Sequence, residues 1–176
     1  MTEPWGEPYS GRLLRLADFL DALLPGRFDF GKWVGDDWKG AADLSCGTTA
    51  CGLGWATAMP EFQALGLHMR KLGSFGFVAL DTDPECKDIS HTFTMVCRAT
   101  KMLFGIDYNE TEMLFTPNEE AVADPEDEDE DWSEAEAIAE YNAKRDDGAD
   151  ALLPNASARD LARHIRAFVA LRTAAP

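Results

Sequence analysis

Apolar residues recur at helical spacing in three stretches of the chain. In residues 12–24 (RLLRLADFLDALL) they fall 3, 4, 7, 10 and 11 residues after the first of them, which is typical of one face of an amphipathic helix. We expect this helix to end at Pro25 and Gly26. Similar stripes run over 93–104 and 161–169. The first stripe consists of Leu13, Leu16, Ala17, Leu20, Leu23 and Leu24.

Capping residues indicate where these helices begin and end. Gly105 follows the second stripe, as is typical of a helix C-terminus. Another helix is predicted to start shortly after it, with Asn109 as the cap and Glu112 as its partner. Before the third stripe, Ser157 and Asp160 approximate a capping box, although Asp is a weaker partner than Glu.

Residues 67–80 (LHMRKLGSFGFVAL) have a different pattern. Phe75, Phe77 and Ala79 alternate with smaller residues beside a Gly-Ser turn, which predicts a short hairpin or edge strand. The fold is therefore expected to be mainly α with a small β-hairpin, with α+β as the alternative. Its core is expected to contain Trp55, Phe93, Phe104 and Phe168.

A further helix is predicted from Thr48 to Met59, because Cys51 and Trp55 lie on one side of it and Pro60 follows. Gly52 and Gly54 within it would each destabilise the helix by roughly 1 kcal/mol relative to alanine. We expect the close approach of a neighbouring backbone to compensate for them.

Length and composition favour a single compact domain over residues 1–176, since 45% of the residues are apolar. No stretch of the sequence is apolar enough to span a membrane, and the first residues do not resemble a signal peptide. Four cysteines are too few for a disulfide scaffold in a chain of this size. We therefore expect a cytoplasmic protein with reduced thiols.

The formal net charge of −16 is confined to one part of the chain. Of the 32 acidic residues, 18 lie between Asp107 and Asp150, where there are only two basic residues, and the rest of the chain carries 14 of each sign. A protein that mimics DNA needs negative charge spread over a folded surface at phosphate-like spacing. The distribution instead indicates a solvated acidic block attached to an ordinary globular body.

Two cysteines in the segment SCGTTACGLGWA raise the possibility of catalysis. A cysteine at a helix N-terminus can act as a nucleophile, because backbone N–H groups stabilise its thiolate. Cys51 is placed better for this role than Cys46. The base would have to be His68, His91 or His164, none of which lies in a recognisable partner motif. The alternative is that Cys51 is a small buried residue beneath Trp55.

The cysteines also allow a structural zinc site. Cys46 and Cys51 are separated by four residues, and Cys86, His91 and Cys97 follow with spacings of four and five residues. These are suitable ligand types, but the paired C-x2-C knuckles of strong zinc motifs are absent from the sequence. Burial on a helix face explains Cys97 without a metal. We therefore expect no cofactor.

The run 124–131 (DPEDEDED) is expected to be a mobile acidic loop, because its charges repel one another. A calcium-binding loop starting at Asp127 or Asp129 would lack the glycine that its sixth position requires. Asp127, Asp129 and Asp131 are instead candidates for binding a basic protein partner. The exposed aromatic residues Trp33 and Trp38 are a second candidate surface for a protein partner.

The same acidic run has an alternative partner within the chain, namely Arg159, Arg163 and Arg166 of the last predicted helix. These arginines form the only basic stripe in the sequence, and they are equally explained as the solvated face of that helix. Direct binding of nucleic acid is therefore disfavoured. The oligomeric state is not predicted by these patterns.

Several of these segments resemble a family of small bacterial and phage-borne proteins. They are the leucine-rich first helix, RFDFGKWVG, CGTTACGLGWA at 46–56, and the LFG, LF and TPNE motifs within 103–119. The likeness covers about the first 120 residues and the last helix, and it leaves out the acidic block. The resemblance implies membership of a family with a CGTxAC-x-x-GWA segment, and it implies no activity or site residue.

Three hypotheses for function remain open. The first is a non-catalytic protein-interaction module that acts through its acidic run or its exposed tryptophans. The second is an enzyme or a zinc module centred on Cys46 and Cys51. The third is an acidic decoy for a protein that binds nucleic acid.

Overall fold

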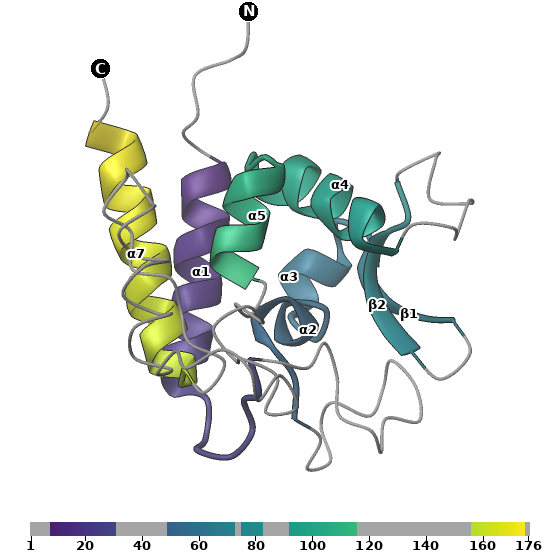
Figure 1. Ribbon diagram of the computed structural model, residues 1–176, viewed down its shortest axis with the longest axis horizontal. Helices are drawn as coiled ribbons and strands as arrows, with labels where there is room; N and C mark the ends of the chain where they lie inside the picture. Colours follow the sequence, from purple (N-terminus) through teal and green to yellow (C-terminus); the bar gives the residue numbers. More distant parts are fainter. Residues whose placement is uncertain (1–7, 31–48, 73–74, 83–91, 116–155, 175–176) are drawn as a thin grey trace, which may run out of the picture.

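The computed structural model describes residues 8–30, 49–72, 75–82, 92–115 and 156–174. This part of the chain is mainly helical with one two-stranded antiparallel sheet, which confirms the predicted fold class (Figure 1). None of its helices has the length and apolar character needed to cross a bilayer. The helices are α1 (Tyr9–Ala22), α2 (Gly52–Ala56), α3 (Pro60–Gln63), α4 (Thr92–Phe104), α5 (Tyr108–Phe115) and α7 (Ala158–Ala174), and the strands are β1 (Leu67–Leu72) and β2 (Phe75–Leu80).

Helices α1 and α7 lie side by side and antiparallel, although the rest of the fold separates them in the sequence (Figure 1). At their edge, the Arg166 guanidinium lies 2.8 Å from Asp18 and 2.6 Å from Asp21. These exposed pairs are each worth only about 0.2–1 kcal/mol, so burial of the apolar faces holds the two helices together. The buried apolar residues are Leu13, Leu16, Ala17 and Leu20 of α1 and Leu161, Ala162, Ile165 and Val169 of α7.

The predicted stripe of α1 is wrong at its end. Helix α1 ends at Ala22, and Leu23 already has an extended backbone with a ψ of 134°. Leu24 is therefore carried away from the buried face and is 69% exposed. Gly26 then turns the chain with a φ of 80°, in the left-handed region that glycine adopts without strain.

The C-terminus of α4 is capped as predicted. Gly105 has a φ of 64°, and its N–H donates to the Lys101 carbonyl at 3.0 Å. A side chain from α1 adds a second cap, because Arg12 donates from its guanidinium to the Leu103 carbonyl at 2.8 Å. This bond satisfies one of the carbonyl groups that a helix end leaves without an internal partner.

Helix α5 begins two residues earlier than predicted. Asp107 and Glu110 form its capping box, in place of the expected Asn109 and Glu112. The Asp107 N–H donates to Glu110 Oε2 at 2.8 Å, and the Glu110 N–H donates to Asp107 Oδ1 at 3.0 Å. Both pairs have the same spacing in the sequence, but a carboxylate cap also interacts favourably with the helix dipole.

The start of α7 agrees with the prediction. The Ser157 N–H donates to Asp160 Oδ2 at 3.0 Å, and the Asp160 N–H donates to Ser157 Oγ at 3.2 Å. The Ser157 hydroxyl also donates to the same carboxylate, and this hydrogen bond lowers the pKa of Asp160. The shorter Asp side chain is therefore able to close the capping box.

Strands β1 and β2 form the predicted hairpin, with Leu67 opposite Leu80 and Leu72 opposite Phe75. Helix α4 lies against β2 (Figure 1). Phe77, Ala79 and Met95 make a small buried cluster between the two elements.

The predicted helix over 48–59 is much shorter in the structure. Ala50 forms a parallel bridge with Phe28, in which the Asp29 N–H donates to the Ala50 carbonyl at 3.2 Å. These long-range hydrogen bonds hold the backbone extended up to Cys51. Helix α2 therefore starts only at Gly52, and Pro60 does not end it but opens α3.

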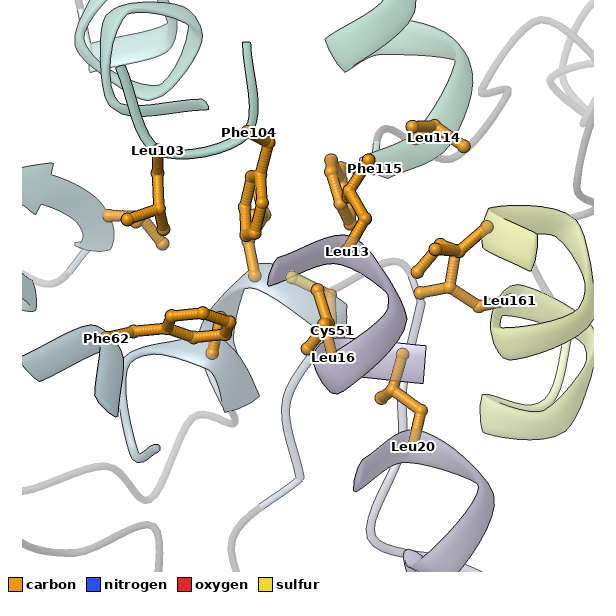
Figure 2. Close-up of a cluster of buried hydrophobic side chains, with 14 of the residues drawn as sticks. Leu13, Leu16, Leu20, Cys51, Phe62, Leu103, Phe104, Leu114, Phe115 and Leu161 are labelled. Carbon is orange, nitrogen blue, oxygen red and sulfur yellow. The ribbon is translucent and has the colours of Figure 1, made fainter. Parts of the chain in front are cut away.

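Aromatic rings form the centre of the main core (Figure 2). Phe62 and Phe104 meet edge to face with ring centres 5.6 Å apart, and Phe115 lies 6.1 Å from Phe104. Trp55 is also buried and Phe168 is partly buried, as predicted, whereas the side chain of Phe93 lies outside the described residues.

Gly52 is the point of closest approach between α2 and its neighbours. A Cβ atom at this position would lie 2.5 Å from Leu161 Cδ2 and 3.6 Å from a ring carbon of Phe115. The predicted close approach of a neighbouring backbone is therefore wrong for Gly52, because side chains from α7 and α5 make the contact. Leu161, which is fully buried, occupies the space that a side chain at position 52 would need.

We predict that Gly52→Ala lowers the free energy of unfolding by up to about 2 kcal/mol, measured by urea titration, because the added methyl group overpacks this contact at a cost of about 1–3 kcal/mol. The gain in helix propensity, at most about 1 kcal/mol, is too small to compensate.

Combining Gly52→Ala with Leu161→Ala serves as the control. Leu161→Ala alone should cost about 2–5 kcal/mol through a cavity. In the double variant the new methyl group points into that cavity, so the total loss should be smaller than the combined single losses by at least about 1 kcal/mol. Additive losses would contradict the proposed contact.

Candidate functional site

Cys51 is the candidate nucleophile that the structure describes. It is the N-cap of α2, where its Sγ accepts a hydrogen bond from the Gly54 N–H at 3.5 Å. It is only 2% exposed and belongs to the main core with Leu13 and Leu16 (Figure 2). Trp55 packs in a separate small cluster with Ala50, so the expectation that Cys51 lies beneath the indole is wrong.

The environment of Cys51 opposes thiolate formation. Burial raises the pKa of the Cys51 thiol to about 11, and the negative charge of Asp29 acts in the same direction. The hydrogen bond from Gly54 lowers the pKa but does not overcome the loss of solvation. Because the thiolate is the reactive form, Cys51 is a poor nucleophile near neutral pH.

Of the three histidine bases proposed from the sequence, the structure describes His68 and His164. Among the described residues, no hydrogen bond joins Cys51 to a histidine. His68 lies on β1, with Nδ1 2.9 Å from the Gly66 carbonyl and with Nε2 accepting from Arg70 Nε at 3.0 Å. This network assigns the proton to Nδ1 in the neutral ring. His164 lies on α7, and His91 is outside the described residues.

The five zinc-ligand candidates are only partly described. Cys46, Cys86 and His91 lie outside the described residues, and Cys51 is in the core. Cys97 is half-buried on α4, where burial and the nearby Glu112 raise its pKa to about 11. Within the described ranges, no three His, Cys, Asp or Glu side chains gather closely enough to hold a metal ion. The zinc module therefore stays an alternative hypothesis.

The binding candidates Trp33, Trp38, Asp127, Asp129 and Asp131 all lie outside the described residues. Their roles therefore also stay predictions.

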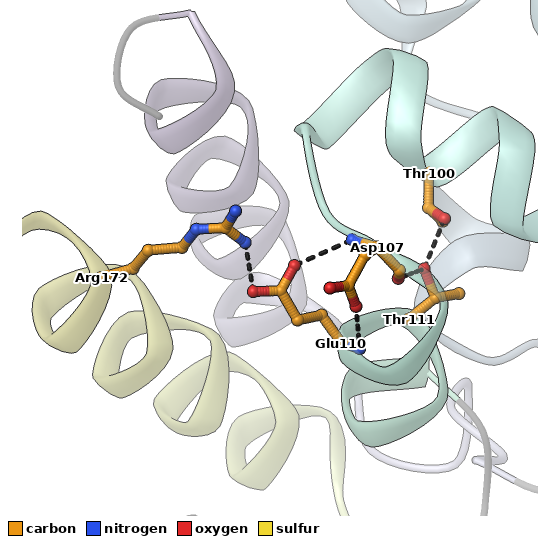
Figure 3. Close-up of polar contacts among 5 residues, drawn as sticks. All are labelled: Thr100, Asp107, Glu110, Thr111 and Arg172. Carbon is orange, nitrogen blue, oxygen red and sulfur yellow. Dashed lines mark hydrogen bonds and ion pairs between the residues drawn. The ribbon is translucent and has the colours of Figure 1, made fainter. Parts of the chain in front are cut away.

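A polar network that the sequence did not predict joins α4, α5 and α7 (Figure 3). Glu110 accepts the Asp107 N–H through one carboxylate oxygen and forms an ion pair with Arg172 through the other. Both side chains of this pair are less than a third exposed. The Arg172 guanidinium also lies 5.7 Å from the centre of the Phe168 ring. The last turn of α7 is thus attached to the first turn of α5.

Two buried hydroxyl groups continue the network. Thr100 Oγ1 lies 2.6 Å from Thr111 Oγ1, and Thr111 Oγ1 lies 2.7 Å from the Asp107 carbonyl. Thr100 Oγ1 also lies 3.1 Å from the Val96 carbonyl and 3.0 Å from the Cys97 carbonyl, so either hydroxyl can be the donor between the two threonines. This contact fixes the position of α5 against α4. The role of this network is structural, because the Glu110 carboxylate already accepts the Asp107 N–H and pairs with Arg172.

In comparisons with protein-family models, curated proteins and solved structures, nothing matches this chain.

The raised pKa of Cys51 predicts that stability falls with rising pH above about 9. The folded thiol ionises only near pH 11, whereas the thiol of the unfolded chain ionises near 9.0, so the unfolded chain loses its proton first in this window. Urea unfolding from about pH 8 to about pH 11 should show this fall. Cys51→Ala should show a smaller fall because it lacks one of the two raised thiols. Parallel curves for the two proteins would contradict the assignment.

The network predicts a difference between two substitutions of Glu110. Glu110→Gln keeps an acceptor for the Asp107 N–H but loses the charge opposite Arg172, and it should cost about 1 kcal/mol of unfolding free energy. Glu110→Ala loses both interactions and should cost about 2–3 kcal/mol. The exposed Glu61→Gln is the control, with an expected effect below about 0.5 kcal/mol. Equal losses for the two Glu110 variants would show that the cap contributes nothing.

Proposed function

We propose that this protein is a non-catalytic interaction module of the cytoplasm, in which the acidic segment recruits a basic protein partner. The observation that carries the proposal is the placement of charge. The whole net charge of −16 is contributed by residues 107–150, and the remainder of the chain has as many basic as acidic residues. A dense local charge raises the concentration of a cationic partner near it and speeds association.

Charged side chains of the described helices form ion pairs with one another. Arg166 pairs with two carboxylates of α1, and Arg172 pairs with Glu110 of α5. These pairs join elements of the fold to one another. Charge pairs between the described helices therefore support the fold, and one of them uses Glu110 of the acid-rich stretch 107–150.

The alternative of a cysteine-centred enzyme loses its better candidate, because Cys51 is a buried cap with a raised pKa. That alternative now depends on Cys46, which lies outside the described residues. The decoy alternative predicts negative charge over a folded surface, and the local concentration of charge favours recruitment of a protein instead.

Binding of decalysine by titration calorimetry tests the proposal. The full chain should bind this peptide with an affinity that falls as salt is added. A variant in which the seven acids of 124–131 become Asn and Gln should bind at least about tenfold more weakly, because the densest charge is removed.

A matched control neutralises seven acids outside this run, at position 120 and within 134–150. It has the same net charge and should lose less than about threefold in affinity. Equal losses in the two variants would show that only total charge matters, and the absence of any binding by the full chain would overturn the proposal.

A further inference from the structure

Helix α7 has a basic face on the side opposite its buried stripe. Counted from Arg159, the next two arginines lie four and seven residues later, at Arg163 and Arg166. This spacing places all three on one side of the helix. Leu161 and Ile165, which are fully buried, lie on the other side. Arg159 is exposed, and the Arg163 side chain is 80% exposed.

These arginines differ in the ion pairs that they form with the described residues. Arg166 is bound to Asp18 and Asp21 of α1. Arg163 contacts Asp160 of its own helix at 2.5 Å, in an exposed pair of the kind that contributes little. No ion pair joins Arg159 to any residue that the structure describes. The first two turns of α7 therefore present positive charge to an anionic partner.

Only the second end of segment 116–155 lies beside this face. Phe115, the last described residue before the segment, lies near Leu161 at Gly52. Leu161 is two residues, about half a turn, from both Arg159 and Arg163, so Phe115 is on the buried side of α7. On the other side of the segment, the chain resumes at Ala156, three residues before Arg159.

The acidic run is within reach of these arginines. It begins nine residues after Phe115, and a chain spans at most about 3.3–3.6 Å per residue, which allows roughly 30 Å. A helix with its side chains is about 10–12 Å across, so this length of chain is enough to pass from the buried side of α7 to the two arginines. Geometry therefore permits contact without any movement of the described helices.

We propose that the run 124–131 docks on the Arg159 and Arg163 face of its own chain, and that a basic partner must displace it. The inference rests on the proposed function and adds a regulatory contact to it. The tether gives the run an effective concentration on the order of millimolar at this face, which compensates for the weakness of each exposed pair. Decalysine and α7 then compete for the same carboxylates.

The double variant Arg159→Gln/Arg163→Gln tests this competition. It should bind decalysine roughly three- to tenfold more tightly than the natural chain at low ionic strength, because the internal competitor is gone. The difference should disappear as salt screens exposed charges. Arg159→Lys/Arg163→Lys keeps both charges and should bind as the natural chain does.

The matched control is Arg15→Gln/Lys101→Gln, which removes the same charge from exposed positions on α1 and α4. It should bind within about twofold of the natural chain. If this control tightens binding as much as Arg159→Gln/Arg163→Gln, net charge explains the effect and the docking is overturned. If tightening depends on protein concentration, the run docks on a second copy and docking in cis is also overturned.

Failure of the proposed function gives a different result. If decalysine binding depends on the run 124–131 but not on Arg159 and Arg163, recruitment stands and docking is overturned. If neither the natural chain nor Arg159→Gln/Arg163→Gln binds decalysine, both are overturned. Binding by that variant alone overturns recruitment by the natural chain and with it the displacement of the run by a partner. The unfolding midpoint of each variant, expected to match that of the natural chain, shows that the fold is unchanged.

Discussion

The seating of Leu161 on Gly52 is the contact on which most of the arrangement depends. It places α7 against α2, and the same point is touched by Phe115 at the end of α5. Three elements from distant parts of the sequence therefore meet where a residue has no side chain. A close-packed interior transmits such a constraint, because neighbouring side chains have little free volume into which to move. The pairing of α1 with α7 is compatible with it, since Leu161 is also part of the buried stripe of α7.

The same packing decides what Cys51 can do. A cysteine before the first turn of a helix is normally a candidate for an acidic thiol, because N–H groups and the helix dipole favour the thiolate. Helix α2 is only five residues long, and Cys51 lies in the main core. Desolvation therefore outweighs the helix, and the pKa of Cys51 rises instead of falling. The motif that looked most reactive in the sequence is a cap that completes the core.

Local patterns were sufficient to predict the long elements. The stripes of α1, α4 and α7 and the alternation in the hairpin report directly which face is buried. The predictions were wrong where contacts with other parts of the sequence help to set where a helix begins. The bridge between Phe28 and Ala50 shortens α2, and contact of Thr111 with Thr100 accompanies the start of α5 at Asp107. Glu110 and Arg172 are 62 residues apart. Their ion pair therefore produces no periodic pattern in the sequence from which it could be predicted. Of the four candidate cysteines, only Cys51 and Cys97 lie in the described residues.

The concentration of the net negative charge in residues 107–150 has a physical advantage for a protein of this composition. Sixteen excess negative charges on a small folded surface would repel one another and destabilise the compact state. Confined to one segment, they act on each other mainly within that segment, because exposed charges are screened over about 8–10 Å in physiological salt. The core is then free to be held by apolar contacts and a few ion pairs between helices. The contacts around Gly52 consequently do not have to offset a repulsion spread over the whole surface.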